Sequence, residues 1–404
     1  MEAAFNWRSH EVAHYQSAVH VTESARPVQP AFCLRPEAAK RAATWFAQRF
    51  PGKPLFAVKA NPSPWMIKIV RDAGLGFDVA SLDEARRVRA LAPQAMMGFM
   101  HPVKSPEAIA EAYFKLGIRT FSLDTTDELE KIVAATNGAD DLTLCIRLAV
   151  SSSFSKISLS SKFGASEAET PALLARARQV AENLGVCFHV GSQAMSPAAY
   201  LNALDVAERV IVKAGVIVDI VNVGGGFPAP YPGMIAPPLG TYVAAIEARF
   251  ERMLVAENAE LWCEPGRSLC AEASSLVLRV EARRDNRLYL NDGAYGALYD
   301  AKTLGWPYPV RAMTSARPNG SAAFEFFGPT CDDYDYIPGP FALPSTIATG
   351  DYVEIGMLGA YGAAMATRFN GFGHYDEFQV TDAPMMTAYA EDNALSVCLG
   401  QFGR

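Results

Sequence analysis

The chain has 404 residues, half of them hydrophobic and a fifth charged, so it can bury a sizeable core and is not a mainly disordered protein. Its formal net charge of −7 disfavours both a nucleic-acid binder and a polybasic membrane-surface protein. No apolar run is long enough to predict a transmembrane helix, and we expect no signal peptide.

Short apolar runs alternate with stretches of helical period from about residue 54 to residue 267. The runs lie within residues 54–61, 76–81, 96–101, 120–124, 142–150, 186–192, 217–226 and 261–267. The intervening stretches carry apolar residues at three- and four-residue spacing, as helices packed on a sheet do. Strands and helices in this alternation predict a (β/α)8 barrel over residues 31–270, with an open doubly wound sheet as the alternative.

The sequence changes character after the eighth predicted strand. Runs such as SSLVLRVEARR and DYVEIG are typical of strands, and Gly, Pro and Asp turns separate them. We therefore predict a C-terminal β-domain, of barrel or sandwich form, over residues 271–404. Residues 1–30 precede the barrel and could pack on either domain.

Cysteines are scattered through the chain, seven in all, without a Cys-x-x-Cys pair. This pattern does not indicate a disulfide framework, and a reducing compartment suits it better. We therefore expect a cytoplasmic protein.

Polar or glycine residues follow every predicted barrel strand. They are Lys59, Asp78, His101, Asp124, Arg147, His189, Gly224 to Gly226, and Glu264 to Arg267. The carboxyl ends of the strands form the active site of such barrels, so we expect these residues to gather. Chains also turn polar wherever strands end, which is enough to account for Asp124 and His101.

Lys59 lies at the end of a predicted buried strand, a position that indicates an amine in a site of low dielectric constant. Burial favours the neutral, nucleophilic amine that forms a Schiff base. A surface lysine that reaches into water is the alternative for Lys59.

Three consecutive glycines in NVGGGFP allow the backbone to approach a ligand closely and to offer N–H groups to a phosphate. A plain turn is the alternative. With Arg267 just beyond the last strand, the glycines indicate a phosphorylated ligand. We therefore expect Glu264 to have a separate role, such as pairing with a protonated heterocyclic nitrogen. His189 is either a core residue or a ring that stacks on a flat ligand.

Acidic residues and a thiol lie among small residues in the predicted β-domain. Cys331 and Asp332 belong to GPTCDDYD, and Asp300 belongs to GALYDA. Turn chemistry is one interpretation. The other is recognition of a substrate ammonium by the carboxylates, beside a thiol that donates a proton.

Taken together, these segments resemble the fold-type III, pyridoxal-phosphate-dependent decarboxylases of basic amino acids, and most closely the eukaryotic-type ornithine decarboxylases with their bacterial members. The segments, between residues 32 and 372, are FAVKAN, FDVAS, SKFG, FHVGS, GGGFP, CEPGR, NDGAYG, GPTCDD and GAYGAAMATRFNGF. The resemblance implies a barrel that binds pyridoxal 5'-phosphate, followed by a β-domain. It also implies a homodimer with shared active sites and a small amino-acid substrate, with no metal, nucleic acid or membrane partner.

The resemblance further implies roles in cofactor binding. Lys59 matches the lysine that bonds covalently to the cofactor, His189 the catalytic histidine stacked on its ring, and Glu264 the carboxylate on the pyridine nitrogen. The other positions that match cofactor-binding residues are Asp78, Glu84, Arg147, Ser192, Gly225, Gly226, Pro265, Gly266, Arg267 and Tyr361.

The resemblance places substrate recognition in the predicted β-domain. Cys331 matches a catalytic cysteine from the other subunit that returns a proton to the α-carbon. Asp300 and Asp332 match the acids that hold the distal amine, and Tyr299 the aromatic residue before the first acid. We therefore expect decarboxylation of L-ornithine to putrescine and CO2, a step of polyamine biosynthesis, with some activity on lysine.

Other functions remain open. Lysine or diaminopimelate decarboxylation is the alternative within the family, although two acids in CDD suit an ammonium and repel a second carboxylate. A regulatory binder would have lost cofactor-binding positions that this chain keeps. A racemase would need a second acid or base, commonly a tyrosine, facing Lys59.

One short motif near the start of the chain, His10-Glu11-Val-Ala-His14, has the HExxH pattern of a zinc site, with His20 where a third ligand would fall. Ser17 takes the place of the glycine that the longer motif requires. A short amphipathic helix with solvated histidines is the favoured interpretation.

Overall fold

The computed structural model describes residues 12–158, 162–314 and 319–389. They divide into two compact units. The barrel unit comprises residues 42–228 and 235–269. The β-unit comprises the chain up to Arg41, the segment Ala229–Met234 and the chain from Cys270 onward.

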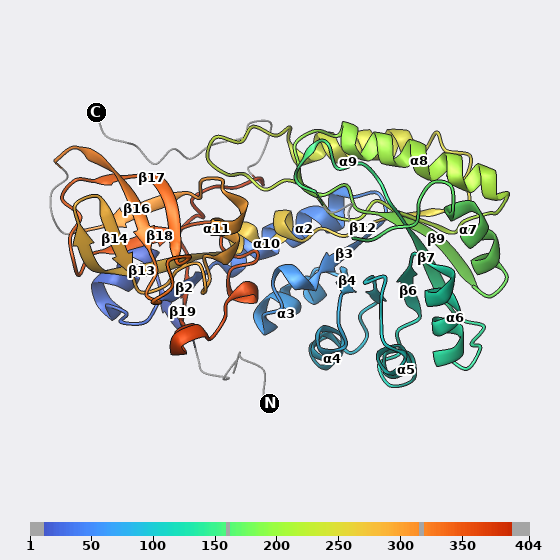
Figure 1. Cartoon of the computed structure of the whole chain (residues 1–404), viewed down its shortest axis with the longest axis horizontal. Coiled ribbons are helices and arrows are strands. Elements are labelled where there is room, and N and C mark those ends of the chain that lie inside the picture. The colour runs from blue at the N-terminus through green and yellow to red at the C-terminus, as the bar shows by residue number, and fades with distance from the viewer. Residues whose placement is uncertain (1–11, 159–161, 315–318, 390–404) are drawn as a thin grey trace. The chain divides into compact units, whose positions relative to one another are not determined.

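The barrel unit contains a closed barrel of parallel strands (Figure 1). Its strands are β3 (Lys53–Ala57), β4 (Gly76–Val79), β5 (Met97–Phe99), β6 (Thr120–Leu123), β7 (Thr143–Leu148), β9 (Asn183–Phe188), β11 (Ile220–Asn222) and β12 (Glu260–Cys263). Strand β12 pairs with β3 and closes the circle. The predicted (β/α)8 barrel is therefore confirmed, and an open sheet is excluded.

Helices lie outside these strands (Figure 1). They are α2 (Pro36–Arg49), α3 (Pro64–Asp72), α4 (Leu82–Leu91), α5 (Pro106–Phe114), α6 (Thr126–Ala135), α7 (Thr170–Arg178), α8 (Ala198–Ala214) and α9 (Leu239–Phe250). The hydroxyls of Ser81, Ser105 and Thr125 cap the first turns of α4, α5 and α6. None of the described helices is long and apolar enough to cross a membrane.

The helical prediction was wrong at one boundary. The sequence predicts helical structure up to the run that begins at residue 186, but α7 ends at Arg178 and β9 begins at Asn183. Pairing of β9 with β7 and β11 in the barrel outweighs the local helical period here.

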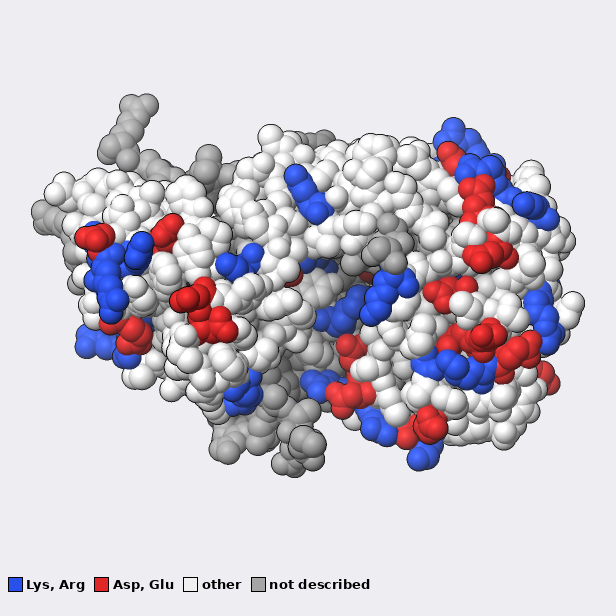
Figure 2. Space-filling model, viewed as in Figure 1, with Lys and Arg blue, Asp and Glu red and all other residues white. Residues whose placement is uncertain are grey.

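Charged side chains on the barrel helices pair across neighbouring helices. Arg249 on α9 contacts Glu208 on α8, and Arg176 on α7 contacts Glu130 on α6 at 2.9 Å. Figure 2 shows basic and acidic side chains interspersed on the face in view. The Arg176–Glu130 pair is exposed, and exposed pairs of this kind contribute little to stability.

The β-unit is built on a nine-stranded sheet of described strands. They are β1 (Ala13–Tyr15), β2 (Ala31–Leu34), β13 (Ser274–Arg284), β14 (Arg287–Leu290), β15 (Val310–Met313), β16 (Ser321–Phe327), β17 (Tyr336–Pro344), β18 (Tyr352–Ile355) and β19 (Asp376–Val380). Strand β13 pairs with β2, β14 and β18 and is central to the sheet. Helix α11 (Tyr299–Leu304) interrupts the run of strands.

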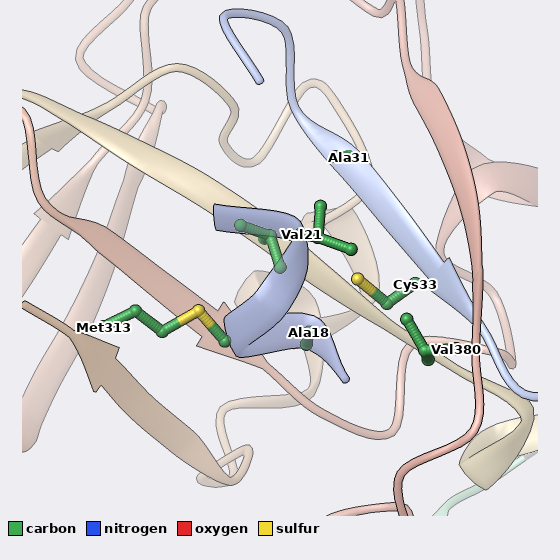
Figure 3. Packing of buried hydrophobic residues seen from close by; sticks show 7 residues of the cluster. Ala18, Val21, Ala31, Cys33, Met313 and Val380 are labelled. Carbon is green, nitrogen blue, oxygen red and sulfur yellow. The ribbon is translucent and has the colours of Figure 1, made fainter. Parts of the chain in front are cut away.

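The N-terminal segment packs on this sheet (Figure 3). Its helical turns are α1 (Ala18–His20) and the π-helical turn Val21–Ala25. Ala18 and Val21 are fully buried against Ala31 and Cys33 of β2, with Met313 and Val380 in the same cluster. These residues thus form part of the β-unit core.

Candidate functional site

Lys59 lies just beyond β3, in the 3-10 turn Val58–Ala60. Its Nζ forms an ion pair with Oδ2 of Asp78 at 3.0 Å. The Asp78 side chain on β4 is 2% exposed, whereas that of Lys59 is 41% exposed. Because a carboxylate this deeply buried requires a cationic partner, the pair fixes the lysine amine at the carboxyl end of the barrel.

Glu84 lies in the first turn of α4. Its N–H donates to Oγ of Ser81 at 3.2 Å, and its Oε2 accepts from the N–H of Ala80 at 2.7 Å. This arrangement resembles a capping box and turns the carboxylate back toward the end of β4. Burial raises the pKa of Glu84, the Ala80 N–H opposes that shift, and the charges of Asp78 and Lys59 act on it in opposite senses.

His189 directly follows β9, at the carboxyl end of a barrel strand. The pairing of β9 with β7 ends at Phe188. Nδ1 of His189 accepts from the N–H of Gly191 at 3.1 Å, which places the proton of the neutral ring on Nε2. Burial lowers the pKa of His189 to about 3, and the cations Lys59 and Arg147 add to this effect. The imidazole is therefore neutral at physiological pH.

The glycine loop after β11 has no room for side chains. Gly224 and Gly226 have φ angles of +67° and +104°. A Cβ on Gly225 would lie 2.7 Å from the carbonyl oxygen of Glu264 and 3.0 Å from Nε2 of His189. The backbone can therefore be approached by a ligand here in a way that no other residue type would permit.

Glu264 follows β12 and is oriented by Asn222, a residue that the sequence analysis did not identify. Nδ2 of Asn222 donates to Oε1 of Glu264 at 2.7 Å, while Oδ1 of Asn222 accepts from the N–H of Gly224 at 2.9 Å. Burial, helped by the charge of Asp78 and opposed by that of Lys59, raises the pKa of Glu264 to about 7. The only signal for Asn222 was its position, as an amide directly before three glycines.

The turn after Glu264 is attached to the barrel. The carbonyl of Pro265 accepts from the N–H of Ala57 on β3 at 3.1 Å. Gly266 leads into the short helix α10 (Arg267–Cys270), and the Arg267 side chain is buried. Nε of Arg267 donates to Oγ of Ser192, on β10 (Ser192–Ala194), at 3.4 Å. A guanidinium and a hydroxyl that meet in this way can bind an anion.

Arg147 on β7 and two other strand-end residues contact the loop that follows β7. The guanidinium of Arg147 lies 5.5 Å from the ring centre of Phe163, and the His101 ring meets the same ring edge-on at 5.1 Å. Oδ2 of Asp124 accepts from the N–H of Gly164 at 2.8 Å. His101 and Asp124 thus hold this loop.

In the β-unit, Tyr299 and Asp300 begin α11. The Asp300 side chain is buried, and its Oδ2 accepts from the hydroxyl of Tyr308 at 2.8 Å. The turn predicted around GALYDA is therefore a helix start. Tyr308 was not identified from the sequence, because nothing local marks a tyrosine as the partner of an acid eight residues earlier.

Cys331 and Asp332 lie on an exposed loop between β16 and β17. The Cys331 thiol contacts Oδ1 of Asn370 at 3.4 Å. Asp332 accepts from the N–H of Tyr334 at 2.8 Å and from the hydroxyl of Tyr295 at 2.9 Å. These two donors lower the pKa of Asp332, which keeps its carboxylate anionic.

Tyr361 lies after β18, in the segment GAYGAAMATRFNGF that carries part of the resemblance. Its φ angle is +58°, an uncommon conformation for a tyrosine. It belongs to the β-unit, whereas the glycine loop and Arg267 belong to the barrel unit.

The possible zinc motif is only partly described. His10 and Glu11 lie outside the described residues, His14 is exposed on β1 and His20 ends α1. The helix predicted for this motif is a strand at His14. Within the described ranges, no group of three or more His, Cys, Asp or Glu residues could hold a metal ion.

Comparisons with known proteins agree with the barrel fold. Residues 37–271 match the family model described as "Pyridoxal-dependent decarboxylase, pyridoxal binding domain". The chain is 34% identical over 326 residues to a lysine/ornithine decarboxylase from Selenomonas ruminantium, which covers 78% of this chain and 80% of that protein.

Two solved structures are similar over most of their length. Lysine decarboxylase from Selenomonas ruminantium matches with a TM-score of 0.79 and 29% identity, over 91% of this chain and 97% of that one. Arginine decarboxylase from the Paramecium bursaria Chlorella virus matches with a TM-score of 0.80 and 25% identity, over 89% and 98%.

Proposed function

The chain belongs to the pyridoxal-dependent decarboxylases, and from this premise we propose that it converts L-ornithine to putrescine and CO2, with L-lysine as a slower substrate. The family acts on basic amino acids with pyridoxal 5'-phosphate. The observation that carries the proposal is the cluster at the barrel's carboxyl end, where the amine of Lys59 is paired with buried Asp78 beside the glycine loop and Glu264.

The residues of this cluster suit the cofactor. The glycine loop, Ser192 and Arg267 offer donors for a phosphate, and the resemblance adds Tyr361. A carboxyl with its pKa raised to about 7, that of Glu264, is suited to share a proton with a basic ring nitrogen. The neutral ring of His189 is suited to stack on a flat heterocycle.

When bound, pyridoxal phosphate supplies an electron sink for the electron pair that CO2 leaves at the α-carbon. Lys59 would hold the cofactor through its amine, and Asp78 keeps that amine in place. Asn222 orients Glu264 by a hydrogen bond, so that its carboxyl faces a fixed direction. Glu84 and Arg147 complete the polar surroundings of the lysine.

The substrate's distal amine would be held by the carboxylates of Asp300 and Asp332, with Tyr299 beside them. The hydrogen bonds to Asp332 keep it anionic, as recognition of an ammonium requires. Cys331 would deliver a proton from Sγ to the α-carbon after CO2 leaves. A second acid at this position disfavours diaminopimelate, whose distal carboxylate it repels.

We also propose that the enzyme is a homodimer in which Cys331 and Asp332 act in the partner's site. Cys331 is exposed, and so are the aromatic side chains of Tyr334, Phe369 and Phe372 in the same unit. Exposed aromatic side chains of this kind favour a protein interface.

The test is CO2 release from L-ornithine, L-lysine and meso-diaminopimelate, measured in parallel with pyridoxal phosphate added. We expect the highest kcat/KM with ornithine and a lower value with lysine. Release chiefly from lysine or from diaminopimelate would overturn the assigned substrate while leaving the cofactor site.

Absence of CO2 release from all three substrates would contradict the proposal, in one of two ways. No release from any of the three, with the absorbance of bound cofactor present, would indicate another amino acid or a racemase. No release without that absorbance would indicate a regulatory binder.

A further inference from the structure

We propose that Tyr308 determines the specificity of this site for a distal ammonium over a guanidinium. The inference rests on the proposed function, in which Asp300 receives the distal amine of the substrate. Its new element is the phenol that holds this carboxylate.

Tyr308 and Asp300 form a buried pair within the β-unit. The phenol oxygen lies 2.8 Å from Oδ2 of Asp300, and the two residues are 3% and 9% exposed. Helix α11 carries Asp300 in its first turn and ends at Gly305, whose φ of +67° reverses the chain. This reversal brings Tyr308 back to the acid that precedes it.

The phenol ring is itself held by packing. Its centre lies 4.9 Å from that of Tyr231, and Tyr231 also contacts Trp306 at 5.5 Å. Tyr231 is fully buried on the segment Ala229–Met234, which follows the glycine loop closely in the chain. Tyr231, itself packed on Trp306, therefore fixes the direction from which the Tyr308 hydroxyl reaches Asp300.

An engaged carboxylate oxygen affects the two kinds of cation differently. An ammonium is a compact charge that one carboxylate oxygen can bind. A guanidinium binds best through two parallel N–H···O bonds, one to each oxygen. The Tyr308 hydroxyl already donates to Oδ2 of Asp300. This bond therefore weakens the two-oxygen binding of a guanidinium more than the one-oxygen binding of an ammonium.

The phenol also prepares the carboxylate for its substrate. A buried carboxylate without a donor is unfavourable. The hydroxyl of Tyr308 is such a donor, and it restrains the rotamer of Asp300 before the substrate arrives. Loss of the hydroxyl should therefore weaken substrate binding more than it slows the chemical step.

Tyr308→Phe tests this inference, because it removes only the hydroxyl and keeps the ring that packs on Tyr231. We expect KM for L-ornithine to rise about tenfold, with kcat within about twofold, as for loss of one charge-assisted hydrogen bond. The ratio of kcat/KM for ornithine to that for L-arginine should fall by about tenfold. Competitive inhibition by putrescine and agmatine gives the same comparison without turnover.

The chain offers a matched control in Tyr113→Phe. The hydroxyl of Tyr113, on α5, donates to Oδ1 of Asp141 at 2.7 Å, and Asp141 precedes β7 at the amino-terminal end of the barrel. This variant loses the same kind of bond away from the site. Its kinetic constants should equal those of the wild type.

The outcomes separate the inference from the function on which it rests. Wild-type release of CO2 from ornithine, with unchanged KM and unchanged discrimination in Tyr308→Phe, would overturn the role of Tyr308 alone. A fall in kcat without a rise in KM would do the same, since it would indicate a general structural effect. If the wild-type protein released no CO2 from any basic amino acid, both the proposed function and this inference would be overturned.

Discussion

At the scale of single residues, the absence of a side chain at Gly225 matters as much as the charged groups around it. Nε2 of His189 and the carbonyl of Glu264 both lie within 3.0 Å of where a Cβ would be. The sequence predicted that three glycines approach a ligand. It could not show that Gly225 also lies tightly between the His189 ring and the backbone carbonyl of Glu264.

Gly225→Ala should weaken pyridoxal phosphate binding by about fivefold or more, because overpacking at a site this tight costs about 1–3 kcal/mol. Gly240→Ala on α9 is the control, since a Cβ there meets nothing within 4 Å. Titration of each protein with the cofactor, followed by absorbance, measures both constants. Equal affinities in the two variants would contradict the close approach inferred at Gly225.

Asp292 is a further buried carboxyl, outside the residues identified from the sequence. It accepts from the N–H of Ala297 at 2.9 Å and from the hydroxyl of Tyr375 at 3.2 Å. Burial raises its pKa to about 7. Between pH 4 and pH 7 the folded protein therefore keeps a proton on Asp292 that the unfolded chain has lost, and the contribution of this residue to stability falls as pH rises.

Asp292→Asn removes this titration while keeping a side-chain oxygen that can accept hydrogen bonds. The free energy of unfolding of wild type, minus that of the variant, should fall from pH 5 toward pH 7 by at most about 1.4 kcal/mol per pH unit. Urea denaturation at several pH values measures the difference. An advantage that does not change with pH would show that Asp292 does not hold the proton.

At the scale of elements, the barrel could be predicted from the alternation of strands and helices, and the β-unit only in outline. Residues 31–34 form β2, which pairs with β13 and β19 from the far end of the chain. Pairings between segments this distant leave no local pattern in the sequence. The same reason accounts for the partners missed at the site, Asn222 and Tyr308, since each is recognised only through a contact across the fold.

The N-terminal turns act as a cover over one part of the β-unit core. Val21 is fully buried among Cys33, Met313 and Val380, whereas Val28 in the same segment is 60% exposed. Val21→Ala should lower the stability of the protein by about 1–3 kcal/mol through the lost burial and the cavity left behind. Val28→Ala should leave it unchanged. Equal midpoints of urea denaturation for both variants would contradict this packing.

At the scale of the whole molecule, the proposed enzyme needs residues from two subunits for each site. Lys59 lies in the barrel unit, and Cys331 lies exposed in the β-unit. If they act together across a dimer, a variant lacking either residue is inactive alone. One complete site is restored when the two variants share a dimer.

Mixing Lys59→Ala with Cys331→Ala, after subunit exchange, should therefore recover up to about a quarter of wild-type activity, since half of the dimers are mixed and each has one intact site. Each variant incubated alone is the control. Absence of recovery, with exchange confirmed by differently tagged subunits, would contradict shared sites.

The most direct test of the central claim is the product formed from L-ornithine in deuterated water, followed by NMR together with CO2 release. Decarboxylation with proton return to the α-carbon predicts putrescine that carries one deuterium at that carbon, in equal amount to the CO2. Exchange of the α-proton with no CO2 release, or accumulation of D-ornithine, would contradict decarboxylation and identify a racemase.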